Sequence, residues 1–255
     1  MTDDRAAARI PLLVRYGNFL FRYRNALFPV VLLTLIVAFP PEYPRGSERL
    51  DNLLDIAGVL VALAGQALRV AVIGYVYIAR GGKNRQVYAD GLVTEGFFAH
   101  SRNPLYLGNI LVLLGLFIMH NNRWVYLIGV PFFLIGYAAI VAAEEAYLRG
   151  KFGPGYDAYV AAVPRWIPRL RGLSQSLHGI SFNWRRVILK EYGSTFAWTG
   201  GATALMIYDT LAYYSYGERK AYIDSLLIVL AVLTLGWGIV RYLKKSRRLR
   251  EARAA

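Results

Sequence analysis

One short stretch of the chain combines residues that could bind an anion. Asn103 and Pro104 predict a helix start, because Asn caps helices and Pro suits the first helical position. The free amides of that first turn attract a carboxylate, and Arg102 adds a positive charge beside them. Tyr106 lies on the same turn, and Gly108 allows a ligand or a backbone to approach closely. The alternative is a capped, glycine-containing membrane helix.

An acidic pair, Glu144 and Glu145, follows about twenty apolar residues. Two carboxylates at such a position are costly unless a cation meets them. A sulfonium or an amino group would serve. The alternatives are extension of both side chains to the membrane surface, or pairing with Arg149.

A third stretch begins with a Gly-Pro-Gly turn that predicts a helix break. It continues with Tyr156 and Tyr159, and then with Arg165 and Trp166. Aromatic and basic side chains together suit the headgroup level of a membrane. A purely interfacial segment is the alternative to a ligand site.

Arg69 is a lone charge within an apolar segment. Ionisable residues at such positions face a cavity or a partner acid. Asp209 is the other comparably placed charge. A structural pair between Arg69 and an acid and a substrate contact are both open.

The composition indicates a membrane protein. Of the 255 residues, 56% are hydrophobic and 18% are charged, and the apolar residues form blocks of helix length. The net charge of +14 comes from Lys and Arg beside these blocks, which suits anionic lipid and does not suggest a nucleic-acid partner. There is no cysteine, so disulfides and thiolate metal ligands are excluded, and we predict no metal site.

The predicted fold class is all-α: a polytopic bundle of about six membrane helices. The third and fourth apolar segments form a helical hairpin, and the third is short, about 22 Å against a hydrocarbon core of about 30 Å. The predicted membrane segments are 26–39, 52–79, 105–119, 124–143, 195–214 and 221–242.

The distribution of Lys and Arg predicts the orientation. Twenty-four of the 30 lie in segments 1–25, 80–102, 144–194 and 241–255, whereas five lie in the intervening loops. Basic loops stay in the cytoplasm, so both termini should be cytoplasmic. We expect a bacterial inner membrane with the site on the cytoplasmic side, and an N-terminal anchor that is not cleaved.

We predict three regions. Residues 1–50 form a basic arm and the first membrane helix, residues 51–172 form the core, and residues 173–255 form a C-terminal extension to which no role is assigned.

Taken together, the motifs have an order and spacing that resemble those of one superfamily. The region 65–168 resembles the isoprenylcysteine carboxyl methyltransferases and phospholipid N-methyltransferases, which are integral membrane enzymes. The matching motifs are Gly65–Arg69, Gly91–Gly96, Ser101–Gly108, Glu144-Glu145 and Phe152–Pro168.

The resemblance implies that S-adenosylmethionine is the cofactor. Many members have His where this chain has Asn103, so a capping or hydrogen-bonding role carries over and an imidazole role does not. We predict catalytic roles for Glu145, Arg165 and Arg69, and for Arg165 the resemblance implies a place beside the substrate. The resemblance also implies a cofactor site formed by Gly96, Arg102, Asn103, Pro104, Tyr106, Gly108, Glu144, Glu145, Tyr156 and Tyr159.

Methyl transfer from a sulfonium needs positioning and exclusion of water more than covalent help. The expected acceptor is a membrane lipid or a lipidated molecule. An amine acceptor must lose a proton, which the Glu pair could take. A carboxylate acceptor would suit Arg165 or Arg69. The sequence leaves both acceptors, and the oligomeric state, open.

Three other functions are alternatives. A sterol-type reductase using NADPH has a similar helical core, but two acids would repel its phosphates. A transporter or channel would need more charge within the membrane than this chain has. A non-catalytic membrane scaffold is the third alternative.

Overall fold

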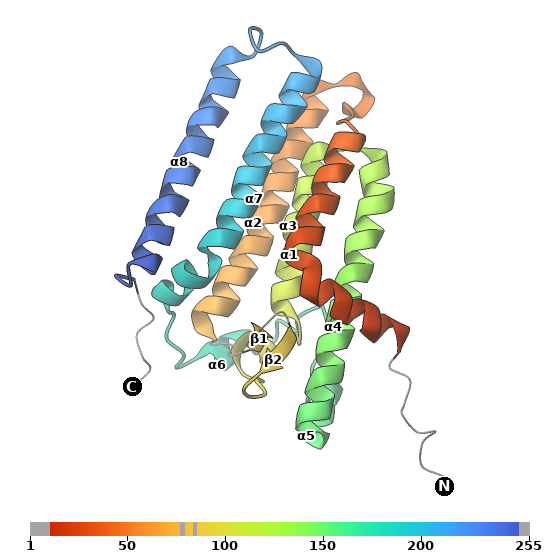
Figure 1. The fold of residues 1–255 in the computed structure, drawn as a ribbon, viewed down its shortest axis with the longest axis vertical. Coiled ribbons are helices and arrows are strands. Elements are labelled where there is room, and N and C mark those ends of the chain that lie inside the picture. The colour runs from red at the N-terminus through yellow and green to blue at the C-terminus, as the bar shows by residue number, and fades with distance from the viewer. Residues whose placement is uncertain (1–10, 77–79, 84–85, 250–255) are drawn as a thin grey trace.

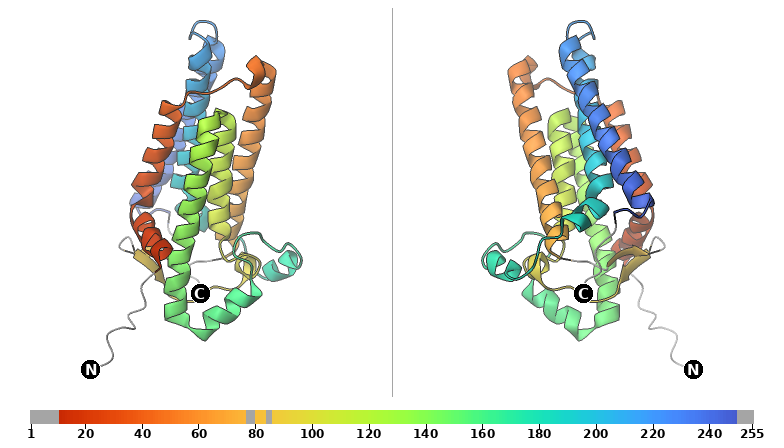
Figure 2. Two further views of the ribbon diagram at one scale, coloured as in Figure 1. Left: turned by 90° about the vertical axis from the view of Figure 1, so that its right-hand side faces the viewer. Right: turned by 90° about the vertical axis from the view of Figure 1, so that its left-hand side faces the viewer.

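The computed structural model describes residues 11–76, 80–83 and 86–249. Its long helices run side by side as a bundle, and most of its short elements gather at one end (Figures 1 and 2). The long helices are α1 (Leu12–Ala38), α2 (Glu48–Tyr75), α3 (Pro104–His120), α4 (Val130–Phe152), α7 (Trp184–Tyr213) and α8 (Lys220–Lys245). The short elements are η1 (Pro44–Gly46), β1 (Arg80–Lys83), β2 (Gln86–Ala89), η2 (Gly96–Ala99), the π-helical turn η3 (Val125–Gly129), α5 (Pro154–Ala162) and α6 (Leu173–Leu177).

The predicted all-α bundle is confirmed. Within the described ranges, β-structure is limited to one antiparallel pair, in which Arg80 pairs with Ala89 and Lys83 with Gln86. Four helical segments are long and apolar enough to cross a membrane, namely α1, α2, α8 and the segment Val125–Phe152. The third predicted segment is again the short one, as helix α3. The number of crossings and the cytoplasmic position of both termini stay predictions.

Three predicted boundaries were wrong. Helix α1 begins at Leu12 where residue 26 was predicted, α7 begins at Trp184 where residue 195 was predicted, and α4 ends at Phe152 where residue 143 was predicted. A hydropathy pattern marks the part of a helix in hydrocarbon, whereas the helix continues through its basic, interfacial turns. Helix α2 ends at Tyr75, and residues 77–79 of the second predicted segment lie outside the described residues.

The first turns of α1 lie at an angle to the rest of that helix (Figure 1). Pro29 lies inside α1, and an internal proline removes a backbone hydrogen bond and kinks the helix. In the N-terminal part, Leu20 and Phe21 are buried against α4, while Leu12 and Phe19 are exposed. This part of α1 has the apolar outer face of a helix that rests at a membrane surface.

Glycines bring α2 and α3 into backbone contact. A Cβ on Gly65 would lie 2.6 Å from the Gly108 oxygen, and a Cβ on Gly115 would lie 2.4 Å from the Gly58 oxygen. Small residues at such contacts let membrane helices pack closely where no hydrophobic force drives them together. Helix α1 approaches α4 in the same way at Gly17. Because α3 packs chiefly on α2 and α4 chiefly on α1, the predicted α3–α4 hairpin is open between its two helices.

The end of the bundle that carries β1, β2, η2, α5 and α6 is named the hairpin end after the β1–β2 pair. It lies opposite the turn that connects α3 to α4. Helices α1, α3 and α7 begin there, and α2, α4 and α8 end there (Figure 1). Residues from all three predicted regions therefore meet at the hairpin end.

Candidate functional site

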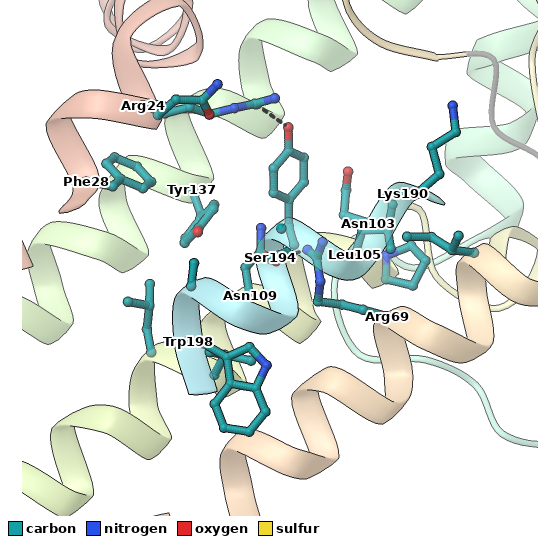
Figure 3. Close-up of a pocket in the computed structure, with 18 of the residues that line it drawn as sticks. Arg24, Phe28, Arg69, Asn103, Leu105, Asn109, Tyr137, Lys190, Ser194 and Trp198 are labelled. Atoms are coloured by element: carbon teal, nitrogen blue, oxygen red, sulfur yellow. Dashed lines mark hydrogen bonds between the residues drawn. The ribbon is translucent and has the colours of Figure 1, made fainter. Parts of the chain in front are cut away.

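A cavity of about 1030 Å³ opens between the helices near the hairpin end (Figure 3). Its lining is charged and polar toward the hairpin end and apolar farther in. From Pro104 to Leu116 the cavity follows α3 over twelve residue-to-residue steps, which corresponds to roughly 18 Å. Such an amphipathic cavity suits a ligand with a charged part and an apolar part. The lining comes from α1 (Arg24, Asn25, Phe28, Pro29, Leu32), α2 (Arg69, Ile73), Val76, Phe98, Asn103, α3 (Pro104, Leu105, Tyr106, Asn109, Val112, Leu113, Leu116), α4 (Tyr137, Glu144) and α7 (Arg186, Lys190, Gly193, Ser194, Ala197, Trp198).

Glu144 is held in this cavity by a chain of hydrogen bonds. The Tyr106 hydroxyl donates to Glu144 Oε1 at 2.5 Å. Arg24 donates to the same hydroxyl at 2.9 Å, the bond that is drawn as a dashed line in Figure 3. Bonds to ionised partners are among the stronger hydrogen bonds in proteins. The bonds connect α1, α3 and α4 and fix one carboxylate at the polar end of the cavity.

Asn103 and Pro104 also line the cavity. Helix α3 begins at Pro104, so the predicted helix start is confirmed. The predicted side-chain cap is wrong, because the Asn103 side chain accepts no bond from the first turn. Its amide donates instead to the Arg165 carbonyl oxygen at 3.1 Å, which ties the start of α3 to the segment after α5.

Arg69 lines the cavity and has a partner acid. Its Nε lies 2.8 Å from Glu191 Oε2 and its Nη2 lies 2.6 Å from Glu191 Oε1, and its Nη1 donates to Asn109. The acid is on α7, in the turns that were not predicted to be helical. Asp209 is not the partner of Arg69, since it lies 3.3 Å from His120 Nδ1. Arg69 is therefore both an ion-paired residue and part of the cavity wall.

Glu145, next to Glu144, does not line the cavity. It is buried, it lies 3.2 Å from Arg102 Nη2, and it accepts a bond from Arg165 Nε at 3.1 Å. The Glu145 carboxylate raises the pKa of the Arg165 guanidinium through this bond. The alternative partner Arg149 pairs instead with Asp157, at 2.7 Å.

Arg102 is directed toward protein backbone. Its Nη1 donates to the oxygens of Val160 and Val163, at 2.9 and 3.0 Å. The Ser101 hydroxyl donates to the Trp166 oxygen at 2.9 Å, in the same segment. Together, Arg102, Glu145 and Arg165 connect α5 and the segment after it to the start of α3 and to the last turns of α4. These contacts lie outside the cavity.

The remaining predicted residues pack around this arrangement. Gly96 has a φ of +56°, and a Cβ there would lie 2.5 Å from Val76. Gly108 faces α2. Tyr156 is buried, and the Tyr159 hydroxyl donates to the Phe98 oxygen at 2.7 Å. Of the twelve predicted site positions, those that line the cavity are Arg69, Asn103, Pro104, Tyr106 and Glu144. The catalytic and cofactor roles of all twelve stay predictions.

The sequence profile of the phospholipid methyltransferase family matches residues 55–155. The chain is also 30% identical over 175 residues to the cobalt-zinc-cadmium resistance protein CzcN of Cupriavidus metallidurans, covering 67% of this chain and 76% of that protein. This chain belongs to the phospholipid methyltransferase family. The predicted superfamily is thereby confirmed.

A second relative is similar to this chain over a comparable length. The nickel-cobalt-cadmium resistance protein NccN of Alcaligenes xylosoxydans xylosoxydans is 28% identical over 153 residues, covering 60% of this chain and 68% of that protein. No solved structure matches the chain. Within the part of the chain that the structure describes, no three His, Asp or Glu side chains are grouped as a metal site requires.

The family region supplies only part of the cavity. Residues 55–155 include Arg69, Tyr106 and Glu144, whereas Arg24 and Lys190 lie outside it. Sequence reasoning missed Arg24 because it placed this residue in a polar arm before the first helix. It missed the contribution of α7 to the cavity because the C-terminal extension carried no motif. The available signal was the charged pair Lys190 and Glu191, which lies just before the predicted apolar segment 195–214.

Proposed function

We propose that this membrane protein transfers a methyl group from S-adenosylmethionine to a lipid or a lipidated acceptor. We further propose that it does so on the cytoplasmic side of a bacterial inner membrane, where the basic loops would hold the hairpin end. One observation carries the proposal: a member of this family has a cavity whose polar end fixes a carboxylate and whose other end is apolar. Charged cofactor and apolar acceptor could meet there without the acceptor leaving the membrane.

The residues present fit the cofactor. A volume of about 1030 Å³ lies at the upper end of the range for ligand sites, which leaves space for two molecules. Glu144 offers a negative charge to the cofactor's ammonium or sulfonium group, and Asn103 and Pro104 belong to a helix start, where a carboxylate is favoured. Tyr137 and Phe28 offer aromatic surface. When bound, S-adenosylmethionine supplies an activated methyl group.

The chain's own residues would then orient the acceptor and exclude water. Arg24 and Tyr106 keep Glu144 at a fixed position, and apolar side chains of α1 and α3 line the deeper part of the cavity. If the acceptor is an amine, Glu144 can accept its proton before transfer. If the acceptor is a carboxylate, no base is needed, and the Arg69 guanidinium can orient it.

We propose that the Glu145 and Arg165 side chains are positioning residues. Both bind protein groups and neither lines the cavity, so they would act by holding the segment after α5 against α3. Arg69 faces the cavity and is kept as the candidate acceptor contact.

The reductase alternative gains one observation. Arg102 and Arg165 neutralise Glu145, so repulsion of a phosphate-bearing cofactor is weaker than the sequence suggested. Family membership still favours methyl transfer. The metal-resistance names of the two relatives describe those proteins, and no metal role is carried over from them.

Two measurements on the protein in lipid nanodiscs test the proposal. S-adenosylhomocysteine should raise the melting temperature as its concentration increases, and NADPH should not. Incubation with methyl-labelled S-adenosylmethionine and bacterial lipid should then place the label in the organic phase. Stabilisation by NADPH alone would replace the proposal with the reductase, and the absence of both shifts would favour the scaffold.

A further inference from the structure

Helix α7 forms one wall of the cavity although it lies outside the family region. The residues that line the cavity from α7 recur every three or four positions, as two single residues and two adjacent pairs, so they share one face. They are Arg186, Lys190, Gly193, Ser194, Ala197 and Trp198. Helix α7 thus supplies six lining residues, against seven from α3 and two each from α2 and α4.

Helix α7 is held firmly in that place. Glu191 bonds to Arg69 on α2, and the Gln66 amide donates to Glu191 at 3.3 Å. Two helical turns farther along α7, the Trp198 indole donates to Gln66 Oε1 at 2.8 Å. At its start, the Asn183 side chain caps the helix by accepting from the Arg186 amide at 2.9 Å. The wall that α7 presents to the cavity is therefore a fixed surface.

The chemistry of this wall changes along its length. Arg186 and Lys190 carry positive charge at the hairpin end, where Lys190 is exposed. Gly193 follows, and a Cβ there would meet nothing within 4 Å, so the cavity is open beside it. Ala197 and Trp198 then make the wall apolar. A cationic end that continues into an open apolar channel matches an amphiphile with an anionic headgroup.

The charge of the cavity points the same way. Among the described residues that line it, four are Lys or Arg: Arg69 is paired with Glu191, and Arg24 bonds to Tyr106 beside Glu144. The other two, Arg186 and Lys190, both belong to α7. S-adenosylmethionine carries a net positive charge, so these two α7 cations favour an anionic group on the acceptor.

We infer that α7 selects the acceptor: Lys190 and Arg186 bind a phosphate or carboxylate headgroup, and its chain runs past Gly193 toward Trp198. This inference rests on the proposed function for the methyl transfer, whereas binding of the amphiphile can be measured without it.

The probe is dodecyl phosphate, added to the full protein in phosphatidylcholine nanodiscs, with the melting temperature as the readout. Dodecyl phosphate should stabilise the protein, and dodecanol and inorganic phosphate should not. Lys190→Gln should weaken this binding about ten-fold, because a charge-assisted bond is lost. Arg185→Gln is the matched control, since this exposed arginine on the same helix does not line the cavity.

A second pair of variants tests the channel. Gly193→Leu fills open space in the cavity and should weaken dodecyl phosphate binding without lowering the melting temperature of the ligand-free protein. Gly201→Leu, which also meets open space but outside the cavity, should bind normally. All four variants should bind S-adenosylhomocysteine like the wild type.

Three results would overturn the inference. They are unchanged dodecyl phosphate binding in Lys190→Gln, loss of S-adenosylhomocysteine binding in that variant, and equal stabilisation by inorganic phosphate. The second would assign α7 to the cofactor, and the third would leave a small-anion site. Amphiphile binding in a wild-type protein that does not bind S-adenosylhomocysteine would refute the proposed function and keep the α7 site.

Discussion

Glu144 and Glu145 are adjacent in the sequence but have different surroundings. Successive residues of a helix point about 100° apart, so the two carboxylates leave α4 toward different neighbours. Glu144 faces the cavity and accepts from Tyr106, whereas Glu145 is enclosed by Arg102 and Arg165. The sequence predicted that a cation must meet this pair. It could not assign the protein's own arginines to one acid, because Arg102 and Arg165 reach Glu145 only through the folded path of the chain.

This difference predicts opposite effects of two conservative substitutions. Glu144→Gln should leave the melting temperature near that of the wild type and weaken S-adenosylmethionine binding by ten- to hundred-fold, as loss of a charged hydrogen bond would. Glu145→Gln should destabilise the fold by about 3 kcal/mol, because it leaves the buried Arg102 without its anion. Thermal melting and equilibrium binding of both variants in nanodiscs separate the two effects.

The control for this pair is Asp157→Asn, which breaks an exposed ion pair with Arg149. Exposed pairs contribute only about 0.5 kcal/mol, so both readouts should stay near wild type. A Glu144→Gln variant that binds S-adenosylmethionine normally would remove Glu144 from the cofactor site. A greater loss for S-adenosylmethionine than for S-adenosylhomocysteine would indicate that Glu144 faces the sulfonium.

At the scale of elements, hydropathy predicted the apolar middles of the helices but not their ends. The interfacial turns of α1 and α7 are rich in Arg, Lys and Tyr, so a pattern of apolar residues does not include them. These turns carry Arg24 and Lys190, which line the cavity, and Glu191, which pairs with the cavity residue Arg69. The α2–α3 contact had a visible signal in Gly65 and Gly108, but the pairing of two glycines on different helices follows from packing, which no single segment reveals.

The glycine contact gives a prediction about α2 and α3. Gly65→Ala should destabilise the protein by about 1–3 kcal/mol, because the added methyl group would lie 2.6 Å from the Gly108 oxygen and the helices must separate. The cavity wall beside Arg69 would move with them, so S-adenosylhomocysteine binding should fall as well. Melting temperature and ligand affinity are the measurements.

Gly236→Ala on α8 is the matched control, since a Cβ at this position meets nothing within 4 Å. It should be neutral or slightly stabilising, because alanine reduces the freedom of the unfolded chain. If Gly65→Ala were as stable as Gly236→Ala, the close α2–α3 contact would not contribute to stability.

At the scale of the whole molecule, the arrangement of the cavity bears on how an acceptor arrives. The helices pair as α2 with α3 and as α1 with α4, and the cavity lies where the pairs diverge. Its apolar part is formed by residues such as Leu32, Leu113 and Leu116. Leu32 belongs to α1, whose outer face exposes Val30, Leu33 and Val37. We expect an apolar acceptor to enter sideways from the bilayer and the cofactor to enter at the hairpin end.

A series of acceptors with one headgroup and progressively shorter chains tests this route. Each methylene that leaves water for the cavity contributes about 0.8 kcal/mol, which corresponds to roughly a four-fold change in kcat/KM. Chain shortening should therefore lower kcat/KM stepwise until the chain no longer reaches the apolar lining near Leu116, about 18 Å from the start of α3. Leu116→Ala should shift the response toward longer chains, because it enlarges that end of the cavity. A flat series, or equal turnover of the free headgroup, would mean that the acceptor enters from water with the cofactor and that the apolar lining serves only the fold.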